Sequence, residues 1–397
     1  MRILLVSHHY EPEIGAPQRR WSAFVRRFVE AGHQVTVLTP QPHYPFGRRL
    51  PGPRVPTWRA VPGRYGETVV RLPYLPYGPG AGRRLLDQLV TAAASVLPGP
   101  GRRADVVVGT VPALPTLAAG HVLARAVRAP FILEMRDAWP DVIGESGVAT
   151  GRMGRAVSAL VSAGQRRADL VVTTSSRFTD VLTGRGVPRV VTVRNGVHTS
   201  AVPRSPVPPA QRDRLEVLYL GTVGRSQGLV GAVEAAAGLG DRVRLTVVGE
   251  GADRAEVAAA AERFGAPVRL LPPAFGPALW EAYAAADTCL VSLQDWPSFR
   301  FTVPSKTYEL LATQRHISAA VAGETAEIIT ASGGGDVVPP EDPAALAALW
   351  DRLSRDRSRL DVGPAPREWV ARNAELDSLA DSYLDLLATV VRPRAVR

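Results

Sequence analysis

The sequence predicts an α/β fold of two similar-sized domains, each built on a parallel sheet with helices packed against it. A chain of 397 residues is long enough for two domains of ordinary size. Strand and helix patterns alternate through the first half, stop at a proline-rich stretch over residues 199–213, and then restart. Such alternation is typical of parallel sheets, whose ligands bind at the carboxyl ends of the strands. With two facing sheets, we expect the site in the cleft between them.

The first domain opens with a strand, a helix and a second strand. Residues 3–6 form an apolar run, and residues 35–39 form the next one after Gly32. Between them, five apolar side chains make one helical stripe: Trp21, Phe24, Val25, Phe28 and Val29. Further strands are expected at residues 105–109, 131–134, 170–174 and 190–193. Residues 40–82 show no such pattern, and a long irregular segment of this kind is usually functional or mobile.

The second domain repeats the strand–helix alternation after the proline-rich stretch. Strands are expected at residues 217–220, 244–248, 268–270, 288–293 and 317–321. Asp342 followed by Pro343 predicts a helix start, and a final apolar stripe predicts a helix over residues 376–390. We therefore place the first domain at residues 1–198, the linker at 199–213 and the second domain at 214–372.

The composition is that of a globular protein with a basic surface. Hydrophobic residues make up 46% and charged residues 21% of the chain, the formal net charge is +10, and the sequence pI is about 10.4. A basic surface favours phosphate-bearing partners such as nucleotides, nucleic acid or anionic lipids. Lys306 is the only lysine among 47 Lys and Arg residues, which we interpret as drift in a GC-rich genome. Where lysine persists, we expect that a compact ammonium is needed.

Signals for export and for disulfides are lacking in the sequence. The single cysteine, Cys289, lies in an apolar stretch and is expected to fill space in a core. A chain without a disulfide framework fits a reducing compartment. The first apolar run is too short for the core of a signal peptide, and no run has the length of a membrane span. We therefore expect a cytoplasmic protein.

The first motif with chemical meaning is a glycine-spaced loop after the first strand of the second domain. It runs over residues 219–229 and carries Gly221, Gly224 and Gly228 before an alanine-rich helix. Glycines let the backbone approach a phosphate, the helix start supplies free N–H groups, and Arg225 adds a charge. An ordinary loop, whose glycines serve tight turns, explains the spacing equally well.

The second motif is the helix entry Pro304-Ser305-Lys306, with Glu309 one turn later. Residues three apart on a helix project on the same side. An ammonium is suited to a diphosphate, and a carboxylate can accept hydrogen bonds from both hydroxyls of a ribose. The alternative is a surface ion pair of little energetic value, and the solitary lysine favours the functional interpretation.

Two loops of the first domain are candidates for the opposite side of the site. Gly15 precedes a helix whose first turn holds Pro17, so that its amino end is suited to a phosphate. The alternative is a plain loop with surface arginines. The strand at residues 131–134 ends in an acidic and aromatic cluster with Asp137, and such carboxylates orient hydroxyls or act as bases. The alternative there is a structural salt bridge of Arg136.

The seven histidines show no metal-ligand spacing along the chain, so no metal site is predicted. Zinc-protease, Walker and nucleophile-elbow motifs are also lacking in the sequence. His8 and His9 follow the first strand and are expected to line the cleft.

As a set, these motifs resemble those of the GT-B glycosyltransferases of family 4, across essentially the whole chain. The chain is most similar to the bacterial N-acetylfucosamine or N-acetylglucosamine transferases of cell-surface polysaccharide synthesis. The resemblance rests on Gly15-Ala16-Pro17 with Arg19-Arg20-Trp21, Arg136-Asp137 with Trp139-Pro140-Asp141, Asn195-Gly196-Val197, Gly221 with Gln227-Gly228-Leu229, and Pro304-Ser305-Lys306 with Glu309. The motifs are specific for the family and poorly specific for the sugar.

The resemblance implies two facing Rossmann-like domains and a retaining hexosyl transfer from a nucleotide sugar, with no metal or other cofactor. The second domain would hold the donor, and the last helix, residues 373–392, would cross back onto the first. Glu309 matches the ribose-binding glutamate of the family, and Gly15 matches the glycine that faces the diphosphate. The implied donor site is completed by Ser305, Thr222, Gly224, Gln227, Gly249, Glu250 and Pro272. The acceptor side is assigned to Arg19, Arg20, Arg136, His8 and His9.

Departures from the family pattern refine these expectations. The arginine and lysine that hold the diphosphate in many relatives are Thr222 and Gln227 here, so the duty is assigned to Arg225 and Lys306. These two, with Asp137 to orient the acceptor, are the predicted catalytic residues. A glutamate that touches the sugar in many relatives is Phe301 here, which favours a deoxygenated or N-acetylated sugar.

The acceptor and two rival functions are left open by the sequence. A lipid-linked acceptor at an anionic membrane surface and a small molecule of a natural-product pathway fit equally well. A nucleotide-sugar epimerase on the same architecture is an alternative enzyme. A basic nucleic-acid-binding protein is disfavoured, because the arginines are dispersed and form no recognised motif.

Overall fold

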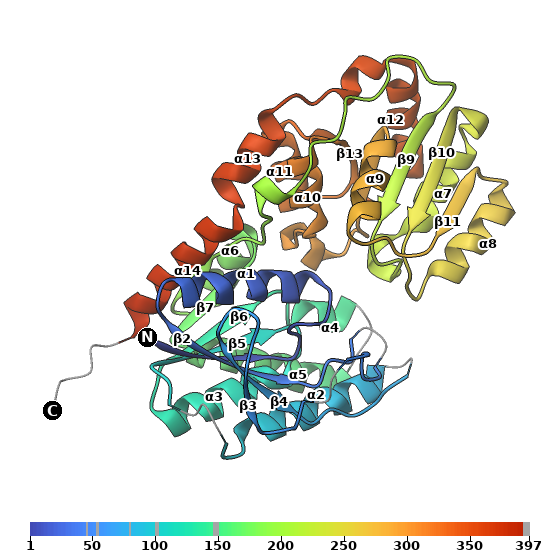
Figure 1. Cartoon of the computed structure of the whole chain (residues 1–397). Helices are drawn as coiled ribbons and strands as arrows, with labels where there is room; N and C mark the ends of the chain where they lie inside the picture. The colour runs from blue at the N-terminus through green and yellow to red at the C-terminus, as the bar shows by residue number, and fades with distance from the viewer. Residues whose placement is uncertain (45–46, 53–54, 79–80, 100–102, 146–150, 392–397) are drawn as a thin grey trace. The chain divides into compact units, whose positions relative to one another are not determined.

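The structure is a computed structural model that describes residues 1–391 except 45–46, 53–54, 79–80, 100–102 and 146–150. The chain, coloured along its length in Figure 1, divides into two compact units. Unit 1 comprises Met1–Asn195 and Leu376–Arg397, and unit 2 comprises Gly196–Glu375. Each unit is an α/β body with its own sheet, and this confirms the predicted fold class.

The sheet of unit 1 has eight strands within the described ranges, in the order β3-β4-β2-β1-β5-β6-β7-β8. All neighbours are parallel except β3 and β4, which are antiparallel. The strands are β1 (Arg2–Ser7), β2 (Gln34–Pro40), β3 (Ala60–Pro62), β4 (Thr68–Leu72), β5 (Val106–Val111), β6 (Phe131–Met135), β7 (Leu170–Thr173) and β8 (Val190–Thr192). The central strands are buried throughout because helices cover both faces of the sheet.

Seven helices belong to unit 1 in the part of the chain that is described. They are α1 (Ala16–Glu30), α2 (Ala81–Val96), α3 (Pro115–Val127), α4 (Asp141–Glu145), α5 (Gly151–Arg167), α6 (Ser176–Gly184) and α14 (Leu376–Val390). In Figure 1, α1 and α14 lie side by side on one face of the sheet, and α2, α3 and α5 lie on the other. The predicted stripe of α1 packs on α14, where the Tyr383 ring lies 5.7, 5.5 and 6.1 Å from the rings of Trp21, Phe24 and Phe28.

Unit 2 has a parallel sheet whose six strands, among the described residues, run in the order β11-β10-β9-β12-β13-β14. The strands are β9 (Leu215–Leu220), β10 (Val243–Val248), β11 (Val268–Leu271), β12 (Thr288–Ser292), β13 (His316–Ala320) and β14 (Gly335–Val338). The helices are α7 (Leu229–Ala237), α8 (Arg254–Phe264), α9 (Pro277–Ala285), α10 (Lys306–Thr313), α11 (Glu324–Ser332), α12 (Pro343–Arg355) and α13 (Ala365–Asn373). Short 3-10 turns are η1 (Thr199–Ala201), η2 (Arg225–Gln227), η3 (Gly240–Arg242), η4 (Pro297–Phe301) and η5 (Arg357–Leu360).

Two apolar layers sandwich the sheet of unit 2. One layer joins α7, α8 and α12 to the sheet around the buried Trp350, and the other joins α9, α10, α11 and α13 around the buried Tyr308. The predicted start of α12 is confirmed, since Asp342 Oδ1 accepts a hydrogen bond from Ala345 N at 2.8 Å. Cys289 lies in β12 with 1% exposure, as expected for a core residue.

Three strands of the structure were not predicted from the sequence. β3 and β4 lie inside residues 40–82, a segment predicted to be irregular, six of whose residues (45–46, 53–54 and 79–80) lie outside the described ranges. β4 contains a buried charge, Arg71, and β14 is a short strand that begins with Gly335 and Asp336. Both sequences break the apolar run on which strand prediction depends.

The proline-rich stretch begins with η1 and otherwise carries no helix or strand up to β9. Arg315, which is 1% exposed, donates from Nη2 to the carbonyl oxygen of Pro206 at 2.7 Å and so fastens this stretch to unit 2. Within the described ranges, the chain contains no helix that is both long enough and apolar enough to span a membrane.

Candidate functional site

The carboxyl ends of β9 and β10 carry two loops whose backbones touch. Gly221 has φ +144° and Gly249 has φ +150°, values that side-chain-bearing residues rarely adopt. A Cβ on Gly249 would lie 1.8 Å from the carbonyl oxygen of Gly221. Val223 N also donates to Glu250 O at 2.9 Å, which ties the loops together. The glycines are thus required by the packing of the loops, and this packing brings bare backbone to the edge of the sheet.

Gln227, predicted to face the donor, serves the loop itself. Its Oε1 accepts a hydrogen bond from Gly224 N at 3.1 Å, and its carbonyl oxygen accepts one from Ser292 Oγ at 2.6 Å. The amide oxygen therefore holds the turn before α7, and the contact of Gln227 with the donor stays a prediction. Thr222 and Arg225 are exposed on the same loop.

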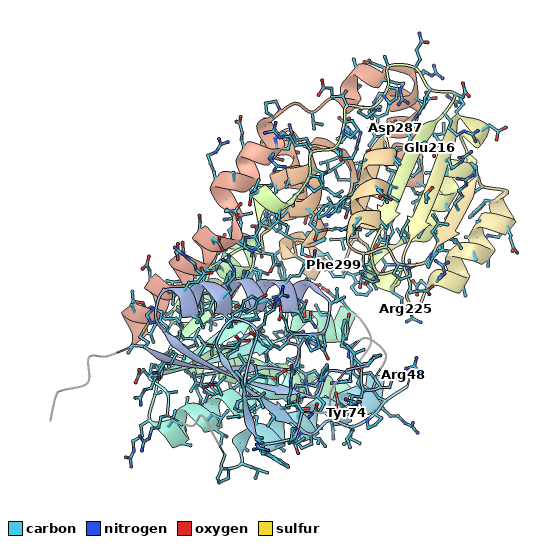
Figure 2. The ribbon with its side chains drawn as sticks, in the orientation of Figure 1. Arg48, Tyr74, Glu216, Arg225, Asp287 and Phe299 are labelled. Atoms are coloured by element: carbon cyan, nitrogen blue, oxygen red, sulfur yellow. The ribbon has the colours of Figure 1, made fainter. Side chains whose placement is uncertain are left out.

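Arg225 is the charged residue of this loop. Figure 2 shows its side chain directed away from the ribbon, at the end of the unit 2 sheet opposite to Glu216 and Asp287. Glu216 and Asp287 lie at the starts of β9 and β12, where Asp287 Oδ2 accepts a hydrogen bond from Glu216 N at 2.9 Å. Arg225 therefore marks the carboxyl end of the sheet, the end at which parallel sheets bind ligands.

Lys306, the first residue of α10, places its ammonium against the loop after β9. Nζ lies 3.7 Å from the centroid of the Tyr219 ring and 3.9 Å from the position that a Cβ of Gly221 would take. Nζ is buried and makes no hydrogen bond with any described residue. Burial lowers the pKa of Lys306 to about 7, against the opposing influence of Cys289 and Glu309. A buried cation without a partner is costly, and an anion that approached Gly221 would relieve that cost.

Glu309 lies one turn further along α10 and is 5% exposed. Tyr283 OH donates a hydrogen bond to Glu309 Oε2 at 3.4 Å, and Ser305 occupies the N-cap position of α10. Because Glu309 is buried and Lys306 Nζ donates it no hydrogen bond, the two residues are not a surface ion pair. That alternative for the motif is excluded.

Two predicted donor residues lie on more exposed parts of the neighbouring loops. Glu250 pairs with Arg254 Nε at 3.4 Å, and its side chain is 61% exposed. Arg254 Nη1 also donates to the carbonyl oxygen of Gly249 at 2.8 Å, so that it braces the loop after β10. Pro272 is exposed directly after β11. The candidate donor site of unit 2 is thus formed by Gly221, Arg225, Lys306 and Glu309 at its centre.

In unit 1, the glycine loop before α1 is organised by Glu13, a residue that the sequence did not single out. Glu13 is 5% exposed, and its Oε2 lies 3.1 Å from His9 Nδ1 and accepts a hydrogen bond from Gln18 Nε2 at 3.0 Å. Its Oε1 accepts hydrogen bonds from the backbone N–H groups of His43 and Tyr44, both at 2.9 Å. One carboxylate therefore connects the loop after β1, the loop after β2 and the first turn of α1, in front of which Gly15 lies.

Arg20, predicted to reach the acceptor side, is instead buried at 2% exposure. Its Nη1 donates to the carbonyl oxygen of Arg194 at 2.5 Å, its Nη2 donates to that of Val193 at 3.1 Å, and its Nε lies 3.4 Å from Glu134. This packing gives Arg20 a structural role, because the apolar stripe of α1 carries it into the core. We correct the assignment accordingly.

Arg136 follows β6, and its side chain is 6% exposed. Nη2 donates to Asn195 Oδ1 at 3.3 Å, and Nη1 lies 4.0 Å from Glu134 Oε1 and makes no hydrogen bond with a described residue. Burial lowers the pKa of Arg136 to about 10. The salt-bridge alternative for this cluster therefore applies to Arg136, which contacts Glu134.

Asp137 and Arg19 keep partial or full exposure at the carboxyl end of the unit 1 sheet. Burial raises the pKa of Asp137, and the cationic Arg136 opposes that rise. Arg19 is exposed on the first turns of α1. These two residues, with Gly15, are the predicted residues of unit 1 that stay within reach of a ligand.

His8 and His9 were expected to line an open cleft, and the structure buries both, at 3% and 4% exposure. His8 Nε2 lies 3.1 Å and His43 Nε2 lies 3.0 Å from the same oxygen, Asp87 Oδ2. Burial lowers the pKa of His8 to about 4, against the influence of Asp87. No pattern along the chain indicated this cluster, because its members come from three segments that only the fold brings together.

Both halves of the chain match family models. Residues 15–196 match the family described as "Glycosyl transferase 4-like domain", and residues 214–356 match the one described as "Glycosyl transferases group 1". The chain is 26% identical over 371 residues to WcaI of Escherichia coli (strain K12), a glycosyl transferase assigned to colanic acid biosynthesis, with 88% of this chain and 91% of WcaI covered. It is 30% identical over 322 residues to the glycosyltransferase WbjE of Pseudomonas aeruginosa, with 74% and 75% covered.

Solved structures share the fold at low sequence identity. The sucrose-phosphate synthase of Thermosynechococcus elongatus superposes with a TM-score of 0.76 at 18% identity, over 98% of both chains. Alr3699/HepE of Anabaena, in its complex with UDP-glucose, superposes with a TM-score of 0.70 at 15% identity, over 98% of this chain and all of that one. The two α/β units with parallel sheets are thus those of the GT-B architecture.

Proposed function

Because this chain belongs to the group 1 glycosyltransferases of family 4, we propose that it is a retaining hexosyltransferase that uses a UDP-activated sugar and needs no metal ion. The observation that carries this proposal is the buried ammonium of Lys306, which faces the bare backbone at Gly221 and makes no hydrogen bond with a described residue. A diphosphate at this loop would pair with that charge, and Arg225 would add a second one from the exposed side.

The proposed chemistry needs stabilisation of the leaving group. As the anomeric C–O bond loosens, the sugar becomes oxocarbenium-like and negative charge grows on the departing diphosphate. Lys306 and Arg225 then stabilise that charge electrostatically. The acceptor attacks from the face of the leaving group, and a phosphate oxygen takes its proton, so that no protein base is required. Asp137 orients the acceptor, which we assign to unit 1.

The assignment of the nucleotide rests on two supports. Alr3699/HepE, which shares the fold over nearly the whole chain, has been solved with UDP and with UDP-glucose. In this chain Glu309 is buried beside Tyr283, where its carboxylate can accept hydrogen bonds from a ribose. Cationic side chains would neutralise the diphosphate, which supports transfer without a divalent ion.

For the sugar, we propose an N-acetylated or deoxygenated hexose. Phe301, at the end of η4, stands where the family resemblance leads us to expect a carboxylate against the sugar hydroxyls, and an aromatic side chain favours a less polar sugar. WcaI is assigned to colanic acid biosynthesis, which supports a role in the synthesis of a cell-surface polysaccharide. We therefore assign the acceptor to the lipid-linked class. Sugar transfer to such an acceptor would take place at the membrane surface.

The surface of α2 supports peripheral contact with an anionic membrane. Three leucines of this helix are exposed, Leu85 at 48%, Leu86 at 53% and Leu89 at 48%. Arg83 and Arg84 precede them and are exposed as well. Apolar side chains beside cationic ones match the acyl boundary and the head groups of an anionic bilayer.

A thermal-shift screen of nucleotide sugars tests the proposed function. A donor at 100 times its Kd stabilises the folded protein by about 2.7 kcal/mol, which raises Tm by several degrees. We expect UDP-sugars to give this shift and the Lys306→Met variant to lose most of it, because its side chain has similar length without charge.

The chain has no second lysine, so the control removes a different charge of unit 2. Glu216→Gln lies at the far end of the unit 2 sheet and should respond like the wild type. A shift that persists unchanged in Lys306→Met would contradict the donor site. Conversion of the donor in the absence of any acceptor, detected by product analysis, would favour the epimerase alternative.

A further inference from the structure

The buried cluster of His8, His43 and Asp87 joins three segments of unit 1. His8 follows β1, His43 follows β2, and Asp87 lies on α2. Their exposures are 3%, 0% and 0%. One ligand atom from each residue lies within 4.8 Å of the other two. Two imidazole nitrogens thus face the same carboxylate oxygen in a region closed to solvent.

The distances around the carboxylate are close to those of a metal coordination shell. Asp87 Oδ2 lies 3.1 Å from His8 Nε2 and 3.0 Å from His43 Nε2. A tetrahedral ion with bonds of about 2.0–2.1 Å holds its ligand atoms roughly 3.3 Å apart. The two nitrogens lie within 4.8 Å of each other, so an ion shared by all three atoms requires side-chain shifts that bring the nitrogens closer together.

Hydrogen bonds with groups outside the cluster orient the His43 ring and the Asp87 carboxylate. His43 Nδ1 lies 2.7 Å from the carbonyl oxygen of Gln41, which can only accept, so that Nδ1 carries a proton. Asp87 Oδ2 also accepts only, so His43 Nε2 donates to it at 3.0 Å, and a metal ion would take the place of this proton. Asp87 Oδ1 accepts a hydrogen bond from Leu75 N at 2.8 Å, which leaves Oδ2 for the centre. Such outer partners orient histidine and carboxylate ligands in metal sites.

We propose that His8, His43 and Asp87 bind one divalent transition-metal ion of the zinc class. The donor set of two imidazole nitrogens and one carboxylate oxygen suits Zn²⁺ and its first-row neighbours, whereas Mg²⁺ and Ca²⁺ require mostly oxygen ligands. Water would complete a tetrahedral shell. The ion is separate from the candidate donor site of unit 2, and the transfer chemistry proposed there does not use it.

The ion would fasten α2 to the loops at the carboxyl end of the unit 1 sheet. The ring of His43 stacks on that of Tyr74, labelled in Figure 2, with centroids 4.8 Å apart. The backbone N–H of His43 donates to Glu13, which organises the loop before α1. Metal binding thus holds the same loops that carry the candidate acceptor side.

The test uses the full-length protein, produced with zinc in the medium and then passed over a chelating resin. Elemental analysis should find about one zinc per chain. After removal with a strong chelator, titration with Co²⁺ should give the visible absorption bands of a tetrahedral site, and added Zn²⁺ should abolish them. This spectroscopic result on the wild type does not depend on whether a variant folds.

Variants assign the site to its residues. Asp87→Asn and His43→Gln should weaken zinc binding by more than about 100-fold, the upper limit for loss of an outer-shell partner. His33→Gln, a histidine of unit 1 outside the cluster, should bind like the wild type, and circular dichroism should confirm that each variant is folded.

Two results would overturn the proposal. One is a wild-type protein that takes up no zinc and gives no tetrahedral Co²⁺ spectrum, which would leave a proton-linked network of Asp87 and the two histidines. The other is unchanged zinc binding in folded Asp87→Asn, which would place the metal elsewhere.

Discussion

At the scale of single residues, Lys306 illustrates why lysine and arginine are not interchangeable. It is the only lysine of the chain, and its ammonium fits between the Tyr219 ring and the backbone of Gly221. A guanidinium is larger and planar, and it would need several hydrogen-bond acceptors that this position does not offer. A small cation on an aromatic face, by contrast, gains a cation–π interaction and leaves its N–H groups for a phosphate.

The pKa of Lys306 predicts that nucleotide binding takes up a proton. With a pKa of about 7, Nζ is mostly neutral at pH 8, and a bound diphosphate favours its charged form. We expect the uptake of close to one proton per UDP at pH 8, and affinity that falls as the pH rises above 7. Calorimetry in buffers of different ionisation enthalpy measures the proton directly. The Lys306→Met variant should show no uptake, and equal uptake in that variant would refute the assignment.

The lowered pKa of Lys306 also makes its effect on the free energy of unfolding depend on pH. The folded protein releases this proton at about pH 7, and the unfolded chain releases it near the ordinary lysine value of about 10.4. The burial of Lys306 therefore destabilises the protein fully below pH 7, and the penalty declines as the pH rises and is gone above that ordinary value. Chemical denaturation of wild type and Lys306→Met at pH 6 and pH 9 should show the larger gain for the variant at pH 6.

At the scale of the element, α2 combines a buried polar face with an exposed apolar one. Asp87, Thr91 and Ser95 face inward, where Asp87 contacts the two histidines, and the leucines at 85, 86 and 89 face solvent. This is the reverse of the usual arrangement for a surface helix, in which apolar residues face the core. The polar face is explained by the cluster that it completes, and the apolar face by the proposed contact with a bilayer.

Replacement of the three leucines tests the membrane contact. The Leu85→Ser, Leu86→Ser, Leu89→Ser triple variant should lose most binding to anionic liposomes, because each buried leucine contributes about 1.5–3 kcal/mol. Nucleotide binding, which we place in unit 2, should stay unchanged. Co-sedimentation with vesicles that contain or lack anionic lipid gives the measurement.

The matched control is Val207→Ser, which alters an apolar side chain of unit 2 that is 63% exposed. Wild-type protein that stays in the supernatant with both kinds of vesicle would argue for a soluble acceptor. Equal loss in the control would show that the effect is not specific to α2.

At the scale of the whole molecule, the last helix returns to the unit where the chain began. α14 belongs to unit 1, and its Tyr383 is fully buried against the aromatic stripe of α1. Arg27 of α1 adds an ion pair with Asp381 at 2.7 Å, of the exposed kind that contributes little. Residues near the C-terminal end of the sequence therefore form part of the core of unit 1.

Truncation after Glu375 should unfold or aggregate unit 1. It would expose Trp21, Phe24 and Phe28, which are buried together with Tyr383. Each of these buried aromatic side chains stabilises unit 1 by about 2 kcal/mol. The full-length chain is the control. Size-exclusion chromatography and near-UV circular dichroism report the outcome, and a well-folded monomer of the truncated chain would contradict the role of α14.

Local sequence signals by themselves determined the alternation of strands and helices, the stripe of α1, the capped start of α12 and the glycine loop after β9. These features depend on near neighbours, because the direction of a side chain repeats with the period of its own helix or strand. Where that period was interrupted, as by Arg71 in β4, the sequence did not reveal the strand. The solitary lysine was also visible in the sequence, because composition needs no fold.

Only the tertiary structure decided which polar groups are buried and what they contact. His43 and Asp87 stand 44 positions apart, and no local pattern links them to each other or to His8. From the sequence, Arg20 was predicted to be a surface residue like Arg19. In the structure, the packing of α1 places it beside Glu134. The amide oxygen of Gln227 accepts a hydrogen bond from Gly224 N, a contact within its own turn that the sequence did not predict. Such contacts depend on the order of strands in the sheet, which brings distant segments together and decides which charges lose their water.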